Sequence, residues 1–358
     1  MTLTDADLMT ALRTVPDPDL GKDLVSLGMV KSAAWAGETA RIHVELTTPA
    51  CPMKDKIRND IISAVRRLSG ATAVPVEVEF SARVRAASGA ERPGALAQVA
   101  HVIAVGAGKG GVGKSTVAVG LALGLARMGA KVGLLDGDIY GPSMPTMLGL
   151  HDREAALGPG TFIPYEVHGV RTMSIGGLVD PEKAVIWRGP MLQSAFKQIA
   201  GQTEWGTLDY LVVDLPPGTG DIPLTLSQML PLSGAVIVCT PQRVAQDDAR
   251  RAVRMFQKLS VEIVGVVENM SYFVGDDCKT YDLFGRGGAQ TMAAEMGLPF
   301  LGELPITTGI RRALDSGRPL DMWSDAALGA SLDGICRSIA AQISVIALGT
   351  SRPTLTVH

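Results

Sequence analysis

The sequence predicts an α/β protein in which a large domain, built on a parallel sheet, follows a small α/β domain. From residue 101 onward, short apolar runs alternate with helical spacings, as strands do in a parallel sheet covered on both faces. One of these runs leads directly into a glycine-rich loop that is followed by a helix. Residues 1–85 carry helix and strand patterns of their own, which predicts a separate domain there.

The small domain, predicted over residues 1–85, shows both periodicities. Residues 5–15 have helical spacing, residues 40–48 are typical of a strand, and residues 74–80 alternate as a half-buried strand does. Residues 53–68 form an amphipathic helix with apolar side chains at Ile57, Ile61, Ile62, Val65 and Leu68. A stretch rich in Ala, Gly, Ser and Pro, without either period, then predicts a linker over 86–99.

The large domain, predicted over residues 100–347, alternates strand-like runs with helices. The runs are residues 101–106, 131–136, 209–214, 234–240, 261–269 and 299–305. In folds of this kind the loops at the carboxyl ends of the strands carry the chemistry, so the residues that follow these runs are the candidate site. An amphipathic helix over 326–347 is expected to pack on the sheet, and residues 348–358 to form a loose tail.

Composition restricts the classes of function. The chain has 358 residues and a formal net charge of -3, which gives no support for a nucleic-acid or anionic-membrane partner. It contains no apolar run of about 18 residues, and its first residues lack the pattern of a secretory signal. Four cysteines are too few for a disulfide scaffold. We therefore expect a cytoplasmic protein that binds neither nucleic acid nor membrane.

The glycine-rich loop predicts a nucleotide site. Residues 108–115 fit the pattern G-x-x-x-x-G-K-[ST] between a strand and a helix, the context that a phosphate-binding loop requires. Backbone N–H groups would hold the phosphates, Lys114 the β and γ oxygens, and the Ser115 hydroxyl a Mg²⁺ ion. The predicted ATP-binding residues are Gly108, Lys109, Gly110, Gly111, Val112, Gly113, Lys114, Ser115 and Thr116. A dinucleotide pattern, Gly106-x-Gly108-x-x-Gly111, also matches, but it leaves residues 113–116 unexplained.

The loop contains a second lysine, Lys109, directly after its first glycine. "GKGGVGKST" resembles the deviant phosphate loop of the MinD, ArsA and nitrogenase-iron-protein ATPases. That resemblance implies a homodimer in which Lys109 crosses to the partner's phosphates, a cation supplied in trans that would make hydrolysis depend on dimerisation. The alternative is a solvated loop lysine.

Polar residues follow three of the predicted strands. The run 131–136 ends in Asp136 with Asp138 close behind, and the run 209–214 ends in Asp214. An aspartate after an apolar strand is the usual partner of the Mg²⁺ shell, which predicts that role for Asp214. The resemblance implies that Asp138 orients the attacking water, that Asp136 contacts the Mg²⁺ shell, and that Asn269 contacts the adenine edge. Strand-terminal aspartates can also be simple caps, and Asn269 a turn residue.

The resemblance narrows further over nearly the whole chain. "DGDIYGPSMPTMLG", "WRGPM", "LVVDLPPGTGD" and "ENMSYF" followed by "FGRGGA" resemble the Mrp/ApbC family of iron–sulfur cluster carriers. "VPDPDLGKDLVSLGMV" and "TTPACPMKD" resemble the small domain of iron–sulfur assembly factors. This implies a slow, Mg²⁺-dependent ATPase that works as a homodimer. It would bind a [4Fe–4S] cluster, interact with cluster assembly factors and transfer the cluster to apo iron–sulfur proteins.

The cluster motif departs from that family. Many members carry Cys-x-x-Cys after "ENMSYF", whereas here Gly275 takes the first position and only Cys278 remains. A symmetric dimer would then supply two thiolates where a [4Fe–4S] cluster takes four. Cys278 is thus either a ligand or an incidental cysteine in a polar loop. Cys51 precedes a predicted helix, whose N-terminus should lower the thiol pKa and favour a ligand or reactive role, although plain packing is the alternative.

Two functions of other classes remain alternatives. One is a positioning ATPase of the MinD or ParA kind, but the tail "GTSRPTLTVH" has one arginine and no apolar face, unlike the basic amphipathic helix of such proteins. The other is an assembly factor that regulates or recruits partners without binding a cluster, which the glycine at position 275 leaves open.

Overall fold

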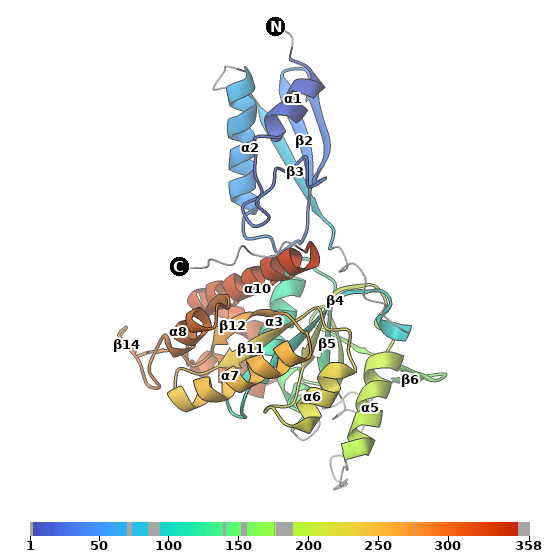
Figure 1. Cartoon of the computed structure of the whole chain (residues 1–358), viewed down its shortest axis with the longest axis vertical. Coiled ribbons are helices and arrows are strands. Elements are labelled where there is room, and N and C mark those ends of the chain that lie inside the picture. Colours follow the sequence, from blue (N-terminus) through green and yellow to red (C-terminus); the bar gives the residue numbers. More distant parts are fainter. Residues whose placement is uncertain are drawn as a thin grey trace. The chain divides into compact units, whose positions relative to one another are not determined.

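The computed structural model divides the chain into two compact units, residues 1–85 with 344–358 and residues 86–343. Figure 1 shows the helices and strands of both units. The described residues are 3–69, 74–84, 94–138, 141–151, 156–174, 176, 189–275 and 277–349. The predicted linker and tail lie mostly outside them, as do motif residues Ile139, Tyr140, Trp187 and Arg188.

The first unit packs two helices on a three-stranded sheet, counted over its described residues. Strands β1 (Val30–Ala36), β2 (Thr39–Leu46) and β3 (Val76–Ala82) lie in that order, β2 antiparallel to β1 and parallel to β3. Helices α1 (Asp5–Leu12) and α2 (Lys54–Ser69) cover it, and Thr4 caps α1 through a capping box with Asp7. The predicted helix over 53–68 is α2; β1 was not predicted.

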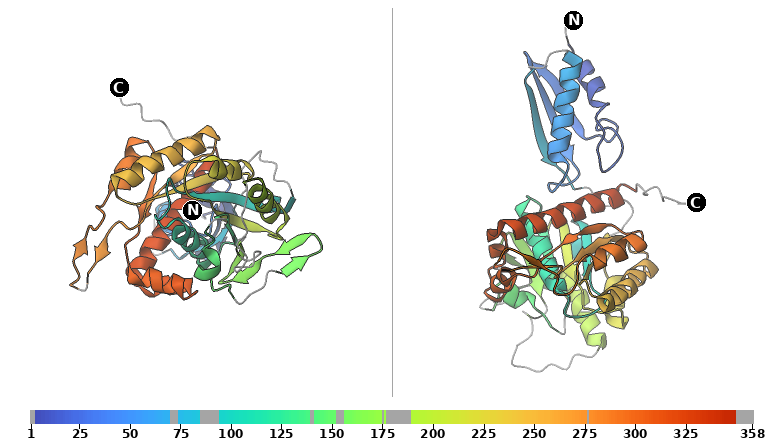
Figure 2. Two further views of the ribbon diagram at one scale, coloured as in Figure 1. Left: turned by 90° about the horizontal axis from the view of Figure 1, so that it is seen from below. Right: turned by 90° about the vertical axis from the view of Figure 1, so that its left-hand side faces the viewer.

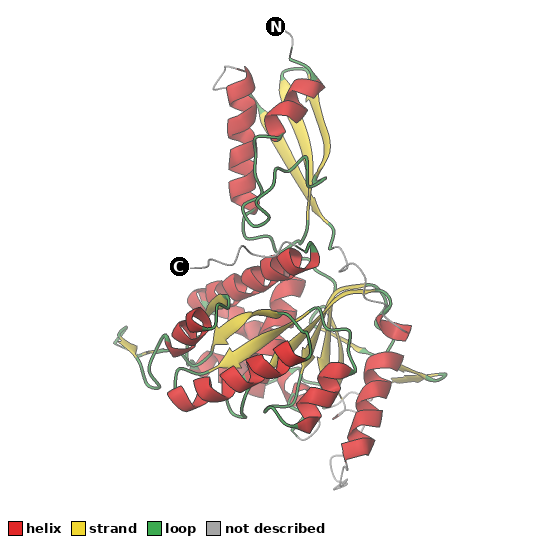
Figure 3. Ribbon diagram, in the orientation of Figure 1, coloured by secondary structure: helices red, strands yellow, loops and turns green. Residues whose placement is uncertain are grey.

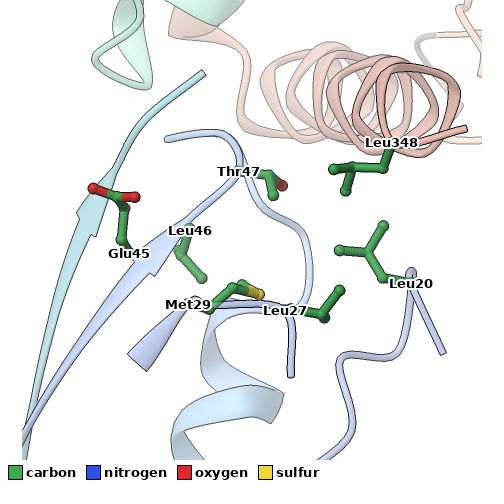
Figure 4. A pocket seen from close by; sticks show the side chains of 7 residues that line it. All are labelled: Leu20, Leu27, Met29, Glu45, Leu46, Thr47 and Leu348. Carbon is green, nitrogen blue, oxygen red and sulfur yellow. The ribbon is translucent and has the colours of Figure 1, made fainter. Parts of the chain in front are cut away.

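A small cavity lies within this unit (Figure 4). Its volume is about 20 Å³, room for a single water at most. It is lined by Leu20, Leu27, Met29, Glu45, Leu46, Thr47 and Leu348. A cavity this small and this apolar is a packing feature.

The second unit is built on an eight-stranded sheet, within the described ranges, of order β15-β12-β11-β4-β10-β5-β9-β8 (Figure 3). Its strands are β4 (Val99–Gly106), β5 (Val132–Asp136), β8 (Tyr165–Val167), β9 (Val170–Ser174), β10 (Leu208–Asp214), β11 (Gly234–Cys239), β12 (Ile263–Glu268) and β15 (Phe300–Glu303). All pair in parallel except β8, which lies antiparallel at the edge. The predicted parallel-sheet fold is confirmed, and β8 and β9 are additions to it.

Helices cover both faces of this sheet (Figure 2). On one face, α5 (Gly189–Gln202), α6 (Asp221–Gln228), α7 (Arg243–Lys258) and α8 (Gly288–Glu295) bury apolar side chains in one core with the strands. On the other, α3 (Lys114–Arg127) packs against α10 (Ala326–Ala347), where Cys336 Sγ lies 3.8 Å from the Gly120 carbonyl oxygen. Among the described residues no helix is both long and apolar enough to span a bilayer.

Shorter elements complete the second unit. They are η1 (Gly94–Leu96), α4 (Met144–Met147), α9 (Thr308–Asp315), η3 (Pro319–Ser324) and two hairpins, β6 (Ala156–Gly158) with β7 (Thr161–Ile163) and β13 (Phe273–Val274) with β14 (Thr280–Tyr281). The register of the sheet matters most for the site. Asp214 pairs with Asp136 across β10 and β5, and Asp136 pairs with Ser174 across β5 and β9. Three polar side chains thus end neighbouring strands at one edge.

Candidate nucleotide site

The phosphate-binding loop joins β4 to α3 and depends on its glycines. Gly111 and Gly113 have φ of 79° and 77°, in the left-handed region that glycine adopts without strain. A Cβ atom on Gly113 would overlap the side-chain amide of Asn269, and one on Gly108 would overlap the backbone carbonyl of Asp248. Both neighbours approach so closely that only glycine fits.

Lys114, Ser115, Asp138 and Asp214 converge at the start of α3. Lys114 Nζ lies 2.5 Å from Asp214 Oδ1 and 3.6 Å from Asp138 Oδ2, and the Ser115 hydroxyl donates to Asp214 Oδ2 at 2.5 Å. Asp214 is fully buried, and this burial raises its pKa, while the Lys114 ammonium and the Ser115 hydroxyl oppose the rise. The structure therefore brings together the lysine, the hydroxyl and two of the carboxylates that the sequence assigned to one site.

Asp136 stands beside this group and is also fully buried. Its Oδ1 accepts from the Asp138 amide at 3.1 Å, and its Oδ2 accepts from the Ser174 hydroxyl at 2.8 Å and the Met144 amide at 3.4 Å. Burial, and secondly the charge of Asp214, raise the pKa of Asp136 to about 7. Sequence reasoning missed Ser174, because it ends a strand, β9, that the sequence did not reveal.

The loop that follows β10 lies against the phosphate-binding loop. The Gly218 amide donates to the Ala107 carbonyl at 2.9 Å, and α6 begins immediately afterwards at Asp221. Asn269 reaches the same loop from the end of β12, with Nδ2 donating to the Val112 carbonyl at 2.9 Å. The predicted Asn269 thus lies at the phosphate-binding loop; its contact with adenine stays a prediction.

Lys109 is half-buried in the same loop. Its ammonium forms no ion pair or hydrogen bond with any of the residues that the structure describes. Nearby Cys239 is buried, and burial raises its pKa to about 12 while Lys109 opposes the rise. Cys239 and the fully buried Cys336 therefore pack as small apolar side chains.

Cys278 is the exposed thiol of the second unit's described residues. It has a φ of 60° in the β13–β14 hairpin, which Figures 1 and 2 show extending away from the sheet. At Gly275 a Cβ atom would lie 2.8 Å from Asp277 Oδ1 and 2.9 Å from the Tyr281 ring. Those two side chains are joined by a hydrogen bond of 2.8 Å from the Tyr281 hydroxyl. A side chain at position 275 would therefore have to displace them.

Cys51 corrects one expectation. The sequence predicted that the N-terminus of α2 would lower its thiol pKa, but burial raises that pKa to about 11. A hydrogen bond from the Met53 amide and the charge of Lys54 lower it, and they do not outweigh burial. Within the described residues no group of three or more His, Cys, Asp or Glu side chains is arranged to hold a metal ion.

Glu268 is a second residue that sequence reasoning missed. It is fully buried at the end of β12, and its carboxylate accepts from the Ser271 hydroxyl at 2.6 Å and from the amides of Gly287 at 2.8 Å and Ala289 at 2.6 Å. A carboxylate at the N-terminus of α8 is favoured by the helix dipole. Glu268 therefore joins "ENMS" to "FGRGG", two motifs whose connection cannot be read from their order in the chain.

Comparison with known proteins agrees with this geometry. The family described as "NUBPL iron-transfer P-loop NTPase" matches residues 98–343, and that described as "Iron-sulfur cluster assembly protein" matches residues 5–78. The chain belongs to the NUBPL iron-transfer P-loop NTPases. The resemblance to the Mrp/ApbC carriers is confirmed.

Two curated relatives cover almost the whole of this NUBPL-type NTPase. The "Iron-sulfur cluster carrier protein" of Deinococcus radiodurans is 50% identical over 94% of this chain and 95% of its own. The protein of the same name from Synechocystis sp. is 46% identical over 97% of this chain and 100% of its own.

Solved structures support the same fold. A nucleotide-binding protein from Archaeoglobus fulgidus in complex with ADP is 38% identical, with a TM-score of 0.57, over 63% of this chain and 89% of its own. The septum site-determining protein MinD of Pyrococcus horikoshii, complexed with Mg-ADP, is 20% identical, with a TM-score of 0.51, over 66% of this chain and 94% of its own. The second likeness concerns the fold alone.

Proposed function

We propose that this chain is an ATP-hydrolysing carrier of iron–sulfur clusters in the cytoplasm, which acts as a homodimer and delivers clusters to apo proteins. The observation that carries the proposal is the convergence of Lys114, Ser115, Asp138 and Asp214 on one phosphate-binding loop. Membership of an iron-transfer family and relatives named as cluster carriers support the cargo. The small unit, which matches an assembly-protein family, is the candidate surface for assembly factors.

The nucleotide chemistry follows from the site. The backbone amides of residues 108–116 and the Lys114 ammonium would bind the phosphates, and Asn269 the adenine. The Ser115 hydroxyl and the Asp214 carboxylate, 2.5 Å apart, are the oxygen donors that Mg²⁺ prefers, with Asp136 beside them. When bound, Mg²⁺ would neutralise charge on the β- and γ-phosphates. Asp138 would orient the attacking water, and Lys109 of the partner subunit would stabilise charge in the transition state.

The proposed cluster site has fewer cysteine ligands than a [4Fe–4S] cluster takes. Cys278 stands on an exposed hairpin, so two subunits could place two thiolates on a shared [4Fe–4S] cluster. Two further ligands must then come from a small thiol or another cysteine, of which Cys51 is the candidate. Its raised pKa disfavours the thiolate until iron displaces the proton.

Anaerobic reconstitution tests the cargo. The protein is incubated with iron, sulfide and a reducing thiol, then desalted and examined by absorption spectroscopy and iron analysis, with and without ATP. We expect a visible iron–sulfur spectrum in the parent chain and its loss in Cys278→Ser. The buried Cys336→Ser is the matched control. Transfer to an apo ferredoxin should follow, and a chain that binds no cluster and transfers none would refute the carrier role.

A second candidate function is an assembly factor that binds no cluster. It is favoured by one observation: Asp277 and the Tyr281 ring lie so close to Gly275 that the Cys-x-x-Cys arrangement would not fit without rearrangement. In that case Cys278→Ser would support iron–sulfur enzyme maturation in cells as well as the parent chain does.

A further inference from the structure

The carboxylate of Asp136 fastens the loop that carries Asp138. Asp138 follows β5 by two residues, and its amide donates to Asp136 Oδ1 at 3.1 Å. At the far end of the loop, the Met144 amide donates to Asp136 Oδ2 at 3.4 Å. One buried carboxylate therefore accepts from the amides of both Asp138 and Met144, and the position of Asp138 depends on the orientation of Asp136.

Ser174 in turn fixes that orientation. It pairs with Asp136 across β5 and β9, is fully buried, and its hydroxyl donates to Asp136 Oδ2 at 2.8 Å. The same hydroxyl accepts from the Gly176 amide at 3.1 Å, so its proton is directed toward the carboxylate. Among the described residues it is the one side chain that donates to Asp136.

The segment after β9 also supports the loop by packing. A Cβ atom on Gly176 would lie 2.8 Å from Pro142 and 3.4 Å from Pro145, so the backbone at Gly176 lies directly on these two prolines. The contact and the hydrogen bond thus act on described residues between β5 and α4: the hydrogen bonds reach Asp138 and Met144, and the packing reaches Pro142 and Pro145. Neither involves the phosphate-binding loop, which lies on the other side of Asp214 in the sheet order.

We propose that Ser174 is a positioning residue for ATP hydrolysis, which orients Asp138 by holding the Asp136 carboxylate. The inference rests on the proposed ATPase function, in which Asp138 aims the water. Among the described residues, no hydrogen bond joins Ser174 to the phosphate-binding loop or to Lys114, so Ser174 should affect turnover more than nucleotide affinity. Displacement of a catalytic group by about 1 Å can cost about a hundredfold in rate.

The test compares Ser174→Ala with Thr172→Val. Thr172 lies two residues earlier in β9, is equally buried, and its hydroxyl has no hydrogen-bond partner among the described residues. Both variants remove one buried hydroxyl from one strand, and equal thermal unfolding midpoints would show that both fold. We expect Ser174→Ala to lower kcat about tenfold or more while the Kd for ATP changes less than about threefold. Thr172→Val should match the parent chain in both.

Hydrogen–deuterium exchange gives a readout independent of hydrolysis. In Ser174→Ala the amides of Asp138 and Met144, which donate to Asp136, should exchange about fivefold faster, with the phosphate-binding loop unchanged, and Thr172→Val should leave both unchanged. Equal turnover and equal exchange in the two variants would overturn the proposal, as would a loss of ATP affinity as large as the loss of kcat. If the parent chain hydrolyses ATP no faster than Asp138→Ala, the proposed ATPase fails, and exchange at the Asp138 and Met144 amides alone decides whether Ser174 positions these residues.

Discussion

At the scale of single residues, burial decides what the charged groups of the site can do. Lys114 and Asp214 are 6% and 0% exposed, so their ion pair is hardly screened by solvent. Burial first, and the charge of the neighbouring Asp214 second, raise the pKa of Asp136. Asp214 of this group, with the Ser115 hydroxyl, supplies the oxygen atoms that we propose hold Mg²⁺ together with ATP.

Burial also predicts how fast the thiols of Cys51 and Cys278 react with an alkylating reagent. Because burial raises the pKa of Cys51 to about 11, its thiol is protonated at neutral pH, and its alkylation by iodoacetamide should be slow. Its rate should increase about tenfold per pH unit up to about pH 11, as the thiolate fraction grows. Exposed Cys278 should react first at pH 7.5. Peptide mass spectrometry would measure both rates.

Single-residue variants assign the two reaction phases. The variant Cys278→Ser should lose the fast phase of alkylation. The variant Cys51→Ser should lose the slow phase, whose rate rises with pH. Equal labelling of both cysteines at pH 7.5 would contradict the effect of burial on Cys51.

At the scale of elements, the sequence predicted those strands and helices whose apolar periodicity or motif lies within the element itself. The phosphate-binding loop, its flanking β4 and α3, and the strand-end aspartates follow from motif and periodicity. Strands β8 and β9 did not, because β8 has only three residues and β9, with Arg171 and Thr172, lacks the continuous apolar run that marks β5. Ser174 and Glu268 were missed for a related reason: their partners lie 38 and 19 to 21 residues away, and only the sheet and the packed helix bring them together.

Glu268 yields a prediction at this scale. Glu268→Gln replaces one acceptor oxygen by an NH₂ group that faces the N-terminal amides of α8. It should lower the free energy of unfolding by about 2 kcal/mol, the cost of buried donors left without an acceptor. Urea unfolding followed by circular dichroism would measure it.

Helix α8 offers a matched control for this variant. Glu295→Gln changes a carboxylate at the other end of the helix that is 56% exposed and pairs with Arg250. It should cost less than about 1 kcal/mol, as surface ion pairs do. Similar losses in the two variants would argue against a special role for Glu268.

At the scale of the whole molecule, the sequence and its family resemblance predicted the carrier class but could not settle the cargo site. The sequence shows that Cys278 is present. It does not show that Tyr281 and Asp277 lie close to Gly275, because that contact depends on the pairing of Phe273 with Tyr281 in the hairpin. The proposed role of Lys109 depends on a second chain, so the structure of one chain does not test it. Among the described residues its ammonium has no ionic partner, which is compatible with the proposal and with a solvated loop lysine alike.

Mixing two inactive variants tests that role directly. Lys109→Ala lacks the group proposed to act in trans, and Asp138→Ala lacks a group that acts in cis, so each homodimer should bind ATP but turn it over at least about a hundredfold more slowly. In a mixed dimer, the site on the Lys109→Ala subunit keeps its own Asp138 and receives Lys109 from the partner. Equal mixing should therefore restore about a quarter of the parent activity, since half of the dimers are mixed and half of their sites complete.

If Lys109 instead acts within its own subunit, both sites of the mixed dimer are defective and activity stays at the level of the separate variants. Lys114→Ala, which should lose ATP binding in its own site, serves as the control, since mixing it with Asp138→Ala leaves neither site complete.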